Sequence, residues 1–238
     1  MKSKKIMIVL AGIAAMIIAG CSSYQKDLLP SIKSVALLSV TVGTDIHRPD
    51  LPKPNSGGIT LINLGKTENF DMKAVANNLK DIMRSPEARF PFQLAPEDIV
   101  FSAKSVKDTL KPMMVSFAPF VEAEGYSRVQ EDSGDVPNAV KDLPPTIDGV
   151  GFVHAKYSIL KKTQEFLFDN GTASVAVEVT VYVKSRANKG VVAKSARVES
   201  GPLLKFEAKS RIDTSNFVDV CKDINAKAIA EIMKTISE

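Results

Sequence analysis

The stretch from Gly149 to Lys184 constrains the fold more than any other part of the chain. Two long segments, 149–168 and 173–184, are joined by Asp169-Asn170-Gly171-Thr172, and Asn-Gly at such a junction is typical of a β-hairpin. Every second residue from Val175 to Val183 is a valine. Because successive side chains of a strand point to opposite faces, this pattern predicts a sheet with one buried face and one more polar face.

The strands continue after this hairpin. A second turn at 187–190 leads into a strand over 191–200, and residues 203–208 are a candidate for one more. A buried first strand is predicted at 32–40 and a further strand region at 90–101, followed by a short helix at 102–110. The sequence therefore predicts a mixed sheet that ends in an antiparallel meander.

Two longer segments have helical periodicity. Residues 69–84 carry an apolar stripe, with Asn69 as the expected N-cap and Pro86 as the stop. Residues 215–236 carry a second stripe that includes Phe217 and Cys221. Both helices are expected to pack on the sheet, which defines an α/β (α+β) fold.

The remaining segments have no clear period. Residues 41–66 are rich in Gly, Pro and Asn, and residues 126–148 are acidic and contain prolines, so both are predicted to be irregular insertions. Residues 111–125 fit a strand or a helix equally well. After a leader (1–20) and a tether (21–31), the pattern predicts a single domain over 32–238.

The amino-terminal leader has the anatomy of a signal peptide. Lysines near the start precede an unbroken apolar run from Ile6 to Ile18, which is too short for a transmembrane helix. The leader ends Ile18-Ala19-Gly20-Cys21, which resembles the lipobox of bacterial lipoproteins. That resemblance implies cleavage between Gly20 and Cys21, acylation of Cys21 with palmitate among its acyl chains, and anchoring to a membrane. Ser22 and Ser23 are not acidic, which in such lipoproteins implies sorting to the outer membrane, facing the periplasm.

The charge balance argues against a nucleic-acid partner. The chain has 31 basic and 27 acidic residues, but Lys2, Lys4 and Lys5 belong to the leader. Without them 28 basic residues remain against 27 acidic ones, which leaves no large positive surface for phosphates.

Cys221, the second cysteine, lies on the apolar helical stripe and is expected to be a buried, inert thiol.

Few residues suggest catalytic chemistry. His154 lies in the first hairpin strand, on the polar face that it shares with Phe152 and Lys156, where exposure to solvent is expected. His47 lies between Asp45 and Asp50 in a loop, where one imidazole and two carboxylates would form only a weak metal site. A calcium site could be formed by acidic residues whose spacing does not match an EF-hand: Glu122, Glu124, Glu131, Asp132 and Asp135. Charged side chains exposed to solvent are the better explanation for the loop around His47 and for this acidic group. The sequence therefore predicts neither a metal ion nor a cofactor.

No motif for an enzyme stands out. Gly149-Val150-Gly151 lacks the third glycine of a dinucleotide-binding loop, and no Gly-x-Ser-x-Gly elbow occurs. The sequence therefore favours a protein that is not an enzyme. A hydrolase stays open as an alternative, because folding can bring two carboxylates together from distant positions.

The order of elements behind the lipobox resembles an α/β domain of envelope proteins. This domain is shared by the curli-secretion lipoprotein, the amino-terminal domain of the Tol-Pal translocation protein and the lipoprotein activators of peptidoglycan synthases. The resemblance is one of pattern over most of residues 32–237, carried by Ser34 to Val40, Phe70 to Arg84, Gly149 to Val153 and the valine strand at 173–184. The insertions at 41–66 and 126–148 depart from it.

The functional expectation is a non-enzymatic binding, assembly or regulatory partner of another envelope protein. The insertion at 41–66 is the expected contact region, because prolines reduce the entropy lost on binding. Its candidate contact residues combine apolar and polar groups: Ile46, His47, Arg48 and Leu51. A lipoprotein that binds a small ligand in a cleft beside the sheet is the alternative.

Overall fold

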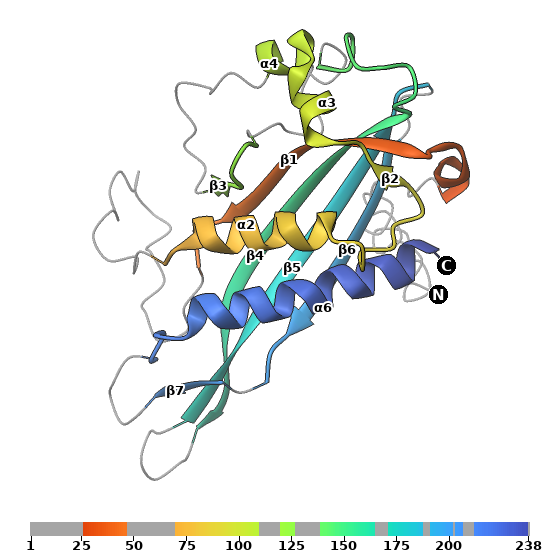
Figure 1. Ribbon diagram of the computed structural model, residues 1–238. Helices are drawn as coiled ribbons and strands as arrows, with labels where there is room; N and C mark the ends of the chain where they lie inside the picture. Colours follow the sequence, from red (N-terminus) through yellow and green to blue (C-terminus); the bar gives the residue numbers. More distant parts are fainter. Residues whose placement is uncertain are drawn as a thin grey trace, which may run out of the picture.

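The domain is built on one mixed sheet, seen in a computed structural model (Figure 1). The model describes residues 26–46, 70–109, 120–126, 139–164, 171–187, 191–201, 203–206 and 212–237. The predicted α/β (α+β) fold is confirmed. Within the described part, the sheet has seven strands: β1 (Ser34–Gly43), β2 (Gln93–Leu94), β3 (Phe120–Glu122), β4 (Gly149–Gln164), β5 (Gly171–Ser185), β6 (Val191–Glu199) and β7 (Leu204–Phe206).

The strands follow the order β2-β1-β4-β5-β6, with β1 parallel to β2 and β4 and with β4, β5 and β6 forming the predicted antiparallel meander. β3 pairs with the end of β1, antiparallel, on the edge where β2 pairs with its start. β7 pairs with the first residues of β5. β1 therefore has strand partners on both edges at its start and at its end, which makes it an internal strand of the sheet.

One face of the sheet is covered by two helices, α2 (Met72–Arg84) and α6 (Phe217–Ser237), which lie across the strands (Figure 1). The predicted valine face is confirmed, because all five valines of β5 are buried in the core that these helices close. α2 supplies Val75 and Leu79 to this core, and α6 supplies Ile229 and Ile232. Removing this much apolar surface from water is the main stabilising contribution to the domain.

On the opposite face, the residues that the structure describes form a second core at one end only. Two short helices, α3 (Glu97–Ser102) and α4 (Lys104–Thr109), pack there with the turn at 139–148 on the starts of β1 and β4. Phe152 is buried in this second core, although the sequence pattern predicts it on a polar face beside His154. That face is therefore apolar where helices cover it and polar further along the strands.

The prediction of a long strand at 90–101 is wrong. Only β2 is extended there, and α3 begins at Glu97. Pro96 precedes α3 and has no N–H to donate to a strand partner. Glu97 and Asp98 lie in the first turn of α3, where negative side chains interact favourably with the helix dipole.

The start of α2 also differs from the prediction. The N-cap is Asp71, whose carboxylate accepts a hydrogen bond from the Ala74 N–H at 3.0 Å, and the predicted cap, Asn69, lies outside the described residues. The helix predicted at 102–110 is confirmed as α4, and the helix predicted at 215–236 is confirmed as α6, two residues later at its start.

The two predicted irregular insertions are more ordered at their described ends than the sequence suggests. β1 continues beyond Val40 to Gly43, because residues 41–43 pair with β3 on one edge while Thr41 and Val42 pair with β4 on the other. Within 126–148, the side chains of Ala139, Leu143 and Ile147 are buried in the second core. The open assignment at 111–125 is resolved for residues 120–122, which form β3.

Among the described residues, no helix is both long enough and apolar enough to cross a membrane. The leader and Cys21 lie outside those residues.

Candidate functional site

A polar surface occupies the middle of the sheet, on the face opposite α2 and α6. Cross-strand pairing places its side chains in two rows, one of His154, Thr180 and Ser195 and one of Lys156, Glu178 and Arg197. We call these six residues the polar sheet face. In the first row the hydroxyl groups of Thr180 and Ser195 form a hydrogen bond of 2.8 Å. In the second row a carboxylate stands between two cations, and all three side chains are exposed.

His154 lies at the edge of this surface nearest to β1. The Thr41 hydroxyl donates to the Val153 carbonyl oxygen at 3.3 Å, so it can accept a hydrogen bond from Nδ1 of His154, which lies 3.0 Å away. The imidazole also packs edge-on against the ring of Phe120, at 4.6 Å between ring centroids. His154 is thus half-buried rather than fully exposed as expected, and its contacts hold the ring in place.

The described ends of both irregular segments meet near β3. Phe120 pairs with Gly43, close to where 41–66 leaves β1, and Tyr126 stands at the start of 126–148. Side chains of α2 form hydrogen bonds to the backbone of residues 120–126. The Lys73 ammonium donates to the Glu122 carbonyl oxygen at 2.7 Å, and Asn77 Oδ1 accepts from the Glu124 N–H at 2.7 Å. We call residues 120–126 the β3 edge.

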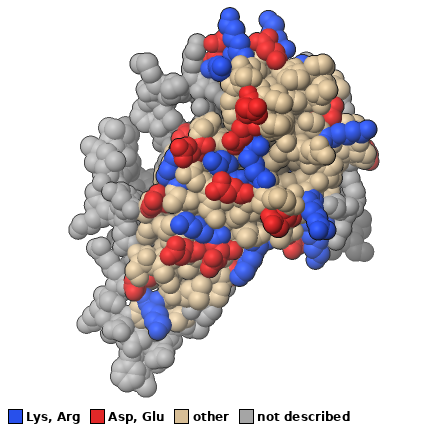
Figure 2. All heavy atoms as spheres, in the orientation of Figure 1, with Lys and Arg blue, Asp and Glu red and all other residues tan. Residues whose placement is uncertain are grey.

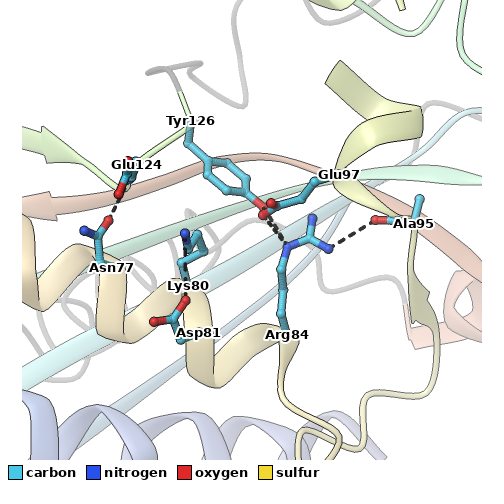
Figure 3. Close-up of polar contacts among 8 residues, drawn as sticks. All are labelled: Asn77, Lys80, Asp81, Arg84, Ala95, Glu97, Glu124 and Tyr126. Atoms are coloured by element: carbon cyan, nitrogen blue, oxygen red, sulfur yellow. Dashed lines mark hydrogen bonds and ion pairs between the residues drawn. The ribbon is translucent and has the colours of Figure 1, made fainter. Parts of the chain in front are cut away.

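Figure 3 shows the polar contacts that join this region to α2 and to the start of α3. Arg84, at the end of α2, lies 2.7 Å from a carboxylate oxygen of Glu97 and donates from Nε to the Tyr126 hydroxyl at 2.8 Å. The Tyr126 hydroxyl donates in turn to Glu97 at 2.7 Å. A further hydrogen bond of 3.3 Å runs from Arg84 to the Ala95 carbonyl oxygen, so this one side chain joins α2 to the β3 edge, to α3 and to the residue after β2.

This cluster is suited to holding structure rather than to catalysis. Burial raises the pKa of Tyr126 well above its usual value, and the hydrogen bond to Glu97 raises it further. The phenol therefore stays protonated and neutral at physiological pH, so it is no general base. The Arg84–Glu97 ion pair is partly buried, and the hydrogen bonds of both side chains to the Tyr126 hydroxyl join the end of the β3 edge to α2 and α3.

We expect Tyr126→Phe to lower the free energy of unfolding by about 1 to 2 kcal/mol, because it removes the hydroxyl that links Arg84 to Glu97 while keeping the ring. The ring contact with Phe101 should persist. Chemical denaturation monitored by circular dichroism measures this change. An unchanged free energy of unfolding would mean that the Tyr126 hydroxyl does not contribute to the stability of this cluster.

The other predicted site residues fall into two groups. Ile46 is half-buried and packs against the main core, so it offers less surface to a partner than expected. Asp45 is exposed, while His47, Arg48, Asp50 and Leu51 lie outside the described residues. Of the acidic group, Glu122 and Glu124 lie on the β3 edge, and Glu131, Asp132 and Asp135 lie outside. Within the described ranges, no three His, Cys, Asp or Glu side chains are placed to hold a metal ion.

Cys221 lies in the core, as expected. It is free and buried, and burial raises the pKa of its thiol well above the usual value, so it carries no thiolate at neutral pH. Gly149 and Gly151 also have a structural explanation. A Cβ atom on Gly151 would lie 3.0 Å from a methyl group of Val35, so glycine allows β1 and β4 to approach.

The face that carries α2 and α6 shows no single charge sign. Acidic and basic side chains are interspersed over both helices (Figure 2), and they include the pairs Lys80–Asp81 at 3.8 Å and Lys222–Asp219 at 3.7 Å. Such exposed pairs contribute little stability. This mixed surface gives no reason to expect a highly charged polymer as partner on this face.

Comparison with known proteins adds no relative: no family model matches the chain, and no curated protein matches it.

The cluster of Arg84, Glu97 and Tyr126 is the feature that sequence reasoning missed. Its members are far apart in sequence, and none belongs to a motif. The chain has only four tyrosines, and a tyrosine buried on folding usually has a hydrogen-bond partner for its hydroxyl. That expectation is the one sequence signal that could have drawn attention to Tyr126.

Proposed function

We propose that this protein is a lipoprotein of the outer membrane that faces the periplasm, is anchored by acyl chains on Cys21, and acts without catalysis as a binding partner of another envelope protein. The observation that carries the anchor is the leader itself. Positive residues, an apolar run, small residues and a cysteine follow one another in the order that lipoprotein processing requires.

The binding role is supported by the kinds of groups that the surface offers. The polar sheet face presents hydroxyl groups and charges of both signs, which suit hydrogen bonding to a protein. Among the described residues, the one cysteine, Cys221, is buried in the core, and the one histidine, His154, lies within hydrogen-bond distance of the Thr41 hydroxyl. The β3 edge is joined to α2 by two hydrogen bonds, so the points where the chain enters and leaves residues 120–126 are fixed relative to the sheet.

Cys21→Ala should release the protein from the membrane fraction, because acylation requires the thiol. Labelling by a fatty-acid analogue should disappear as well, while the folded domain keeps its melting temperature. Fractionation of cells followed by immunoblotting measures the first effect. Cys221→Ala is the matched control and should leave both labelling and fractionation unchanged. Membrane association that persists without Cys21 would disprove the lipid anchor.

For the partner, we expect a Gly/Ser replacement of residues 47–54 to abolish in-cell crosslinking to the envelope protein bound by the wild type. Ile46 is kept because it packs against the core, so the melting temperature should change little. A Gly/Ser replacement of residues 127–134 is the matched control. Crosslinking that survives at 47–54 but is lost on Lys156→Ala or Thr180→Ala would show that the polar sheet face is the interface instead.

A further inference from the structure

The anchor and the folded domain are separated by very few residues. Cys21 is five positions before Lys26, the first residue of the 3-10 helix η1 (Lys26–Ser31), and five residues span at most about 18 Å. η1 is fixed to the domain: Leu29 and Ile32 are buried, and the Ile32 N–H donates to the Leu29 carbonyl oxygen at 3.0 Å. The acyl chains would therefore be held close to one defined point of the domain surface.

That point is at one end of the sheet. The Asp148 carboxylate accepts hydrogen bonds from the backbone N–H groups of Lys33 and Ser34, at 2.9 and 3.0 Å, which joins the chain after η1 to the start of β4. A Cβ atom on Gly149 would lie 3.4 Å from a methyl carbon of Ile32, so the two segments touch. η1 also contacts β6.

From this end, β4 runs 16 residues, or about 50 Å for an extended strand, to the far end of the hairpin. β7 pairs with β5 there. Figure 1 shows η1 and the carboxyl end of α6 on one side of the molecule, and β7 with the start of α6 on the other. The domain thus has a tether end and a hairpin end.

Resting on the anchor proposed above, we propose that the tether end faces the phospholipid headgroups and that the hairpin end points away into the periplasm. In this orientation the β3 edge lies some way above the membrane. Its partner strand β1 ends opposite Ala155, and Ala155 follows Gly149, the first residue of β4, by six residues, which is about 20 Å along an extended strand. The polar sheet face then stands roughly upright, open to a partner that approaches from the side.

The orientation comes from the tether and not from charge. Among the charged side chains whose exposure the structure describes in η1, in the link to β1 and in the last two turns of α6, two are acidic and two are basic: Asp27, Lys33, Glu231 and Lys234. A surface with both signs has little net attraction for anionic lipids. The orientation should therefore be insensitive to salt but sensitive to the length of the tether.

The test uses the full acylated chain in vesicles of phosphatidylethanolamine and phosphatidylglycerol. A thiol-reactive fluorophore is placed at Lys33→Cys, near the tether end, or at Lys205→Cys, in β7. Both lysines are exposed, and the buried Cys221 should not react. Quenching by a lipid with a headgroup quencher should be several-fold stronger at position 33 than at 205, with or without added salt. Equal quenching at the two positions would overturn the proposal.

A longer tether supplies the control. Insertion of 20 Gly/Ser residues after Tyr24 raises the r.m.s. reach to about 25 Å, so the difference between positions 33 and 205 should shrink strongly. A difference that persists unchanged would mean that the surface, not the tether, sets the orientation. Failure of the anchor itself is read separately, from the mass of the peptide that begins at Cys21. A peptide without acyl chains would refute the anchor whatever the quenching shows.

Discussion

Val179→Lys is expected to lower the free energy of unfolding by about 3 to 5 kcal/mol, a large fraction of the roughly 5 to 15 kcal/mol that stabilises an ordinary domain. Val179 has no exposed surface and lies between Ala155 and Ala196 on the face covered by the helices. A lysine there would place an ammonium group in the core without a partner, and a buried unpaired charge is among the most destabilising single changes. Urea denaturation of the purified domain measures the effect.

The neighbouring position provides the control, because Thr180 points to the other face of the same strand. Thr180→Lys removes one hydrogen bond to Ser195 and places the new cation beside open solvent, so a loss of about 1 kcal/mol or less is expected. If Thr180→Lys were as damaging as Val179→Lys, both faces of β5 would have to be covered at this point.

The parts of the fold that the sequence predicts well are those whose signal is local. The alternating valines of β5 and the helical stripes of α2 and α6 each repeat several times within one element, so the period is clear without any knowledge of the partner. The Asn-Gly signal also predicts that the segments on its two sides pair, and β4 and β5 do pair. The predicted turn bounds, 169–172, are wrong, because Gly171 and Thr172 already belong to β5 and pair with Gln164 and Thr163, while Asp169 and Asn170 lie outside the described residues. These three features alone define the layered arrangement of sheet and helices.

The parts that the sequence predicts wrongly or leaves open depend on distant contacts. β2 is extended only where Ser34 and Val35 offer it a partner, and β3 forms because the end of β1 has a free edge. Neither strand carries enough residues to show a period of its own. The burial of Phe152 likewise depends on α3, α4 and residues 139–148, which fold over a face that looks half-polar in the sequence.

The candidate site was harder to predict than the fold for the same reason. The position of the polar sheet face follows from the strand pattern, but the β3 edge depends on Arg84, Glu97 and Tyr126 coming together from three segments. Hydrogen bonds between single residues leave no periodic trace in a sequence. The number of residues between Cys21 and η1 can be counted in the sequence. The orientation of the domain that we infer from it depends on where η1 lies on the sheet, which only the structure gives.

Asn225→Leu is the second change with a large expected effect. Asn225, on α6, is fully buried, and its side chain accepts a hydrogen bond from the Tyr157 hydroxyl of β4. Its amide donates to Asn78 Oδ1 on α2 at 3.1 Å, so one side chain joins the sheet to both helices. Leucine has a similar size but leaves the Tyr157 hydroxyl unpaired in the core.

We expect Asn225→Leu to lower the free energy of unfolding by about 2 to 3 kcal/mol, because a buried polar group without a partner keeps its full desolvation cost. Burial already raises the pKa of Tyr157 well above its usual value, so ionisation offers this hydroxyl no relief near neutral pH. Denaturation of Asn225→Leu, Tyr157→Phe and the double variant separates the contribution of each side chain from the interaction between them. The double variant should lose less stability than the two single changes added together, since leucine and phenylalanine leave no orphaned hydroxyl. Strict additivity would show that the two side chains do not act on one another, and that α6 is held to β4 by apolar packing alone.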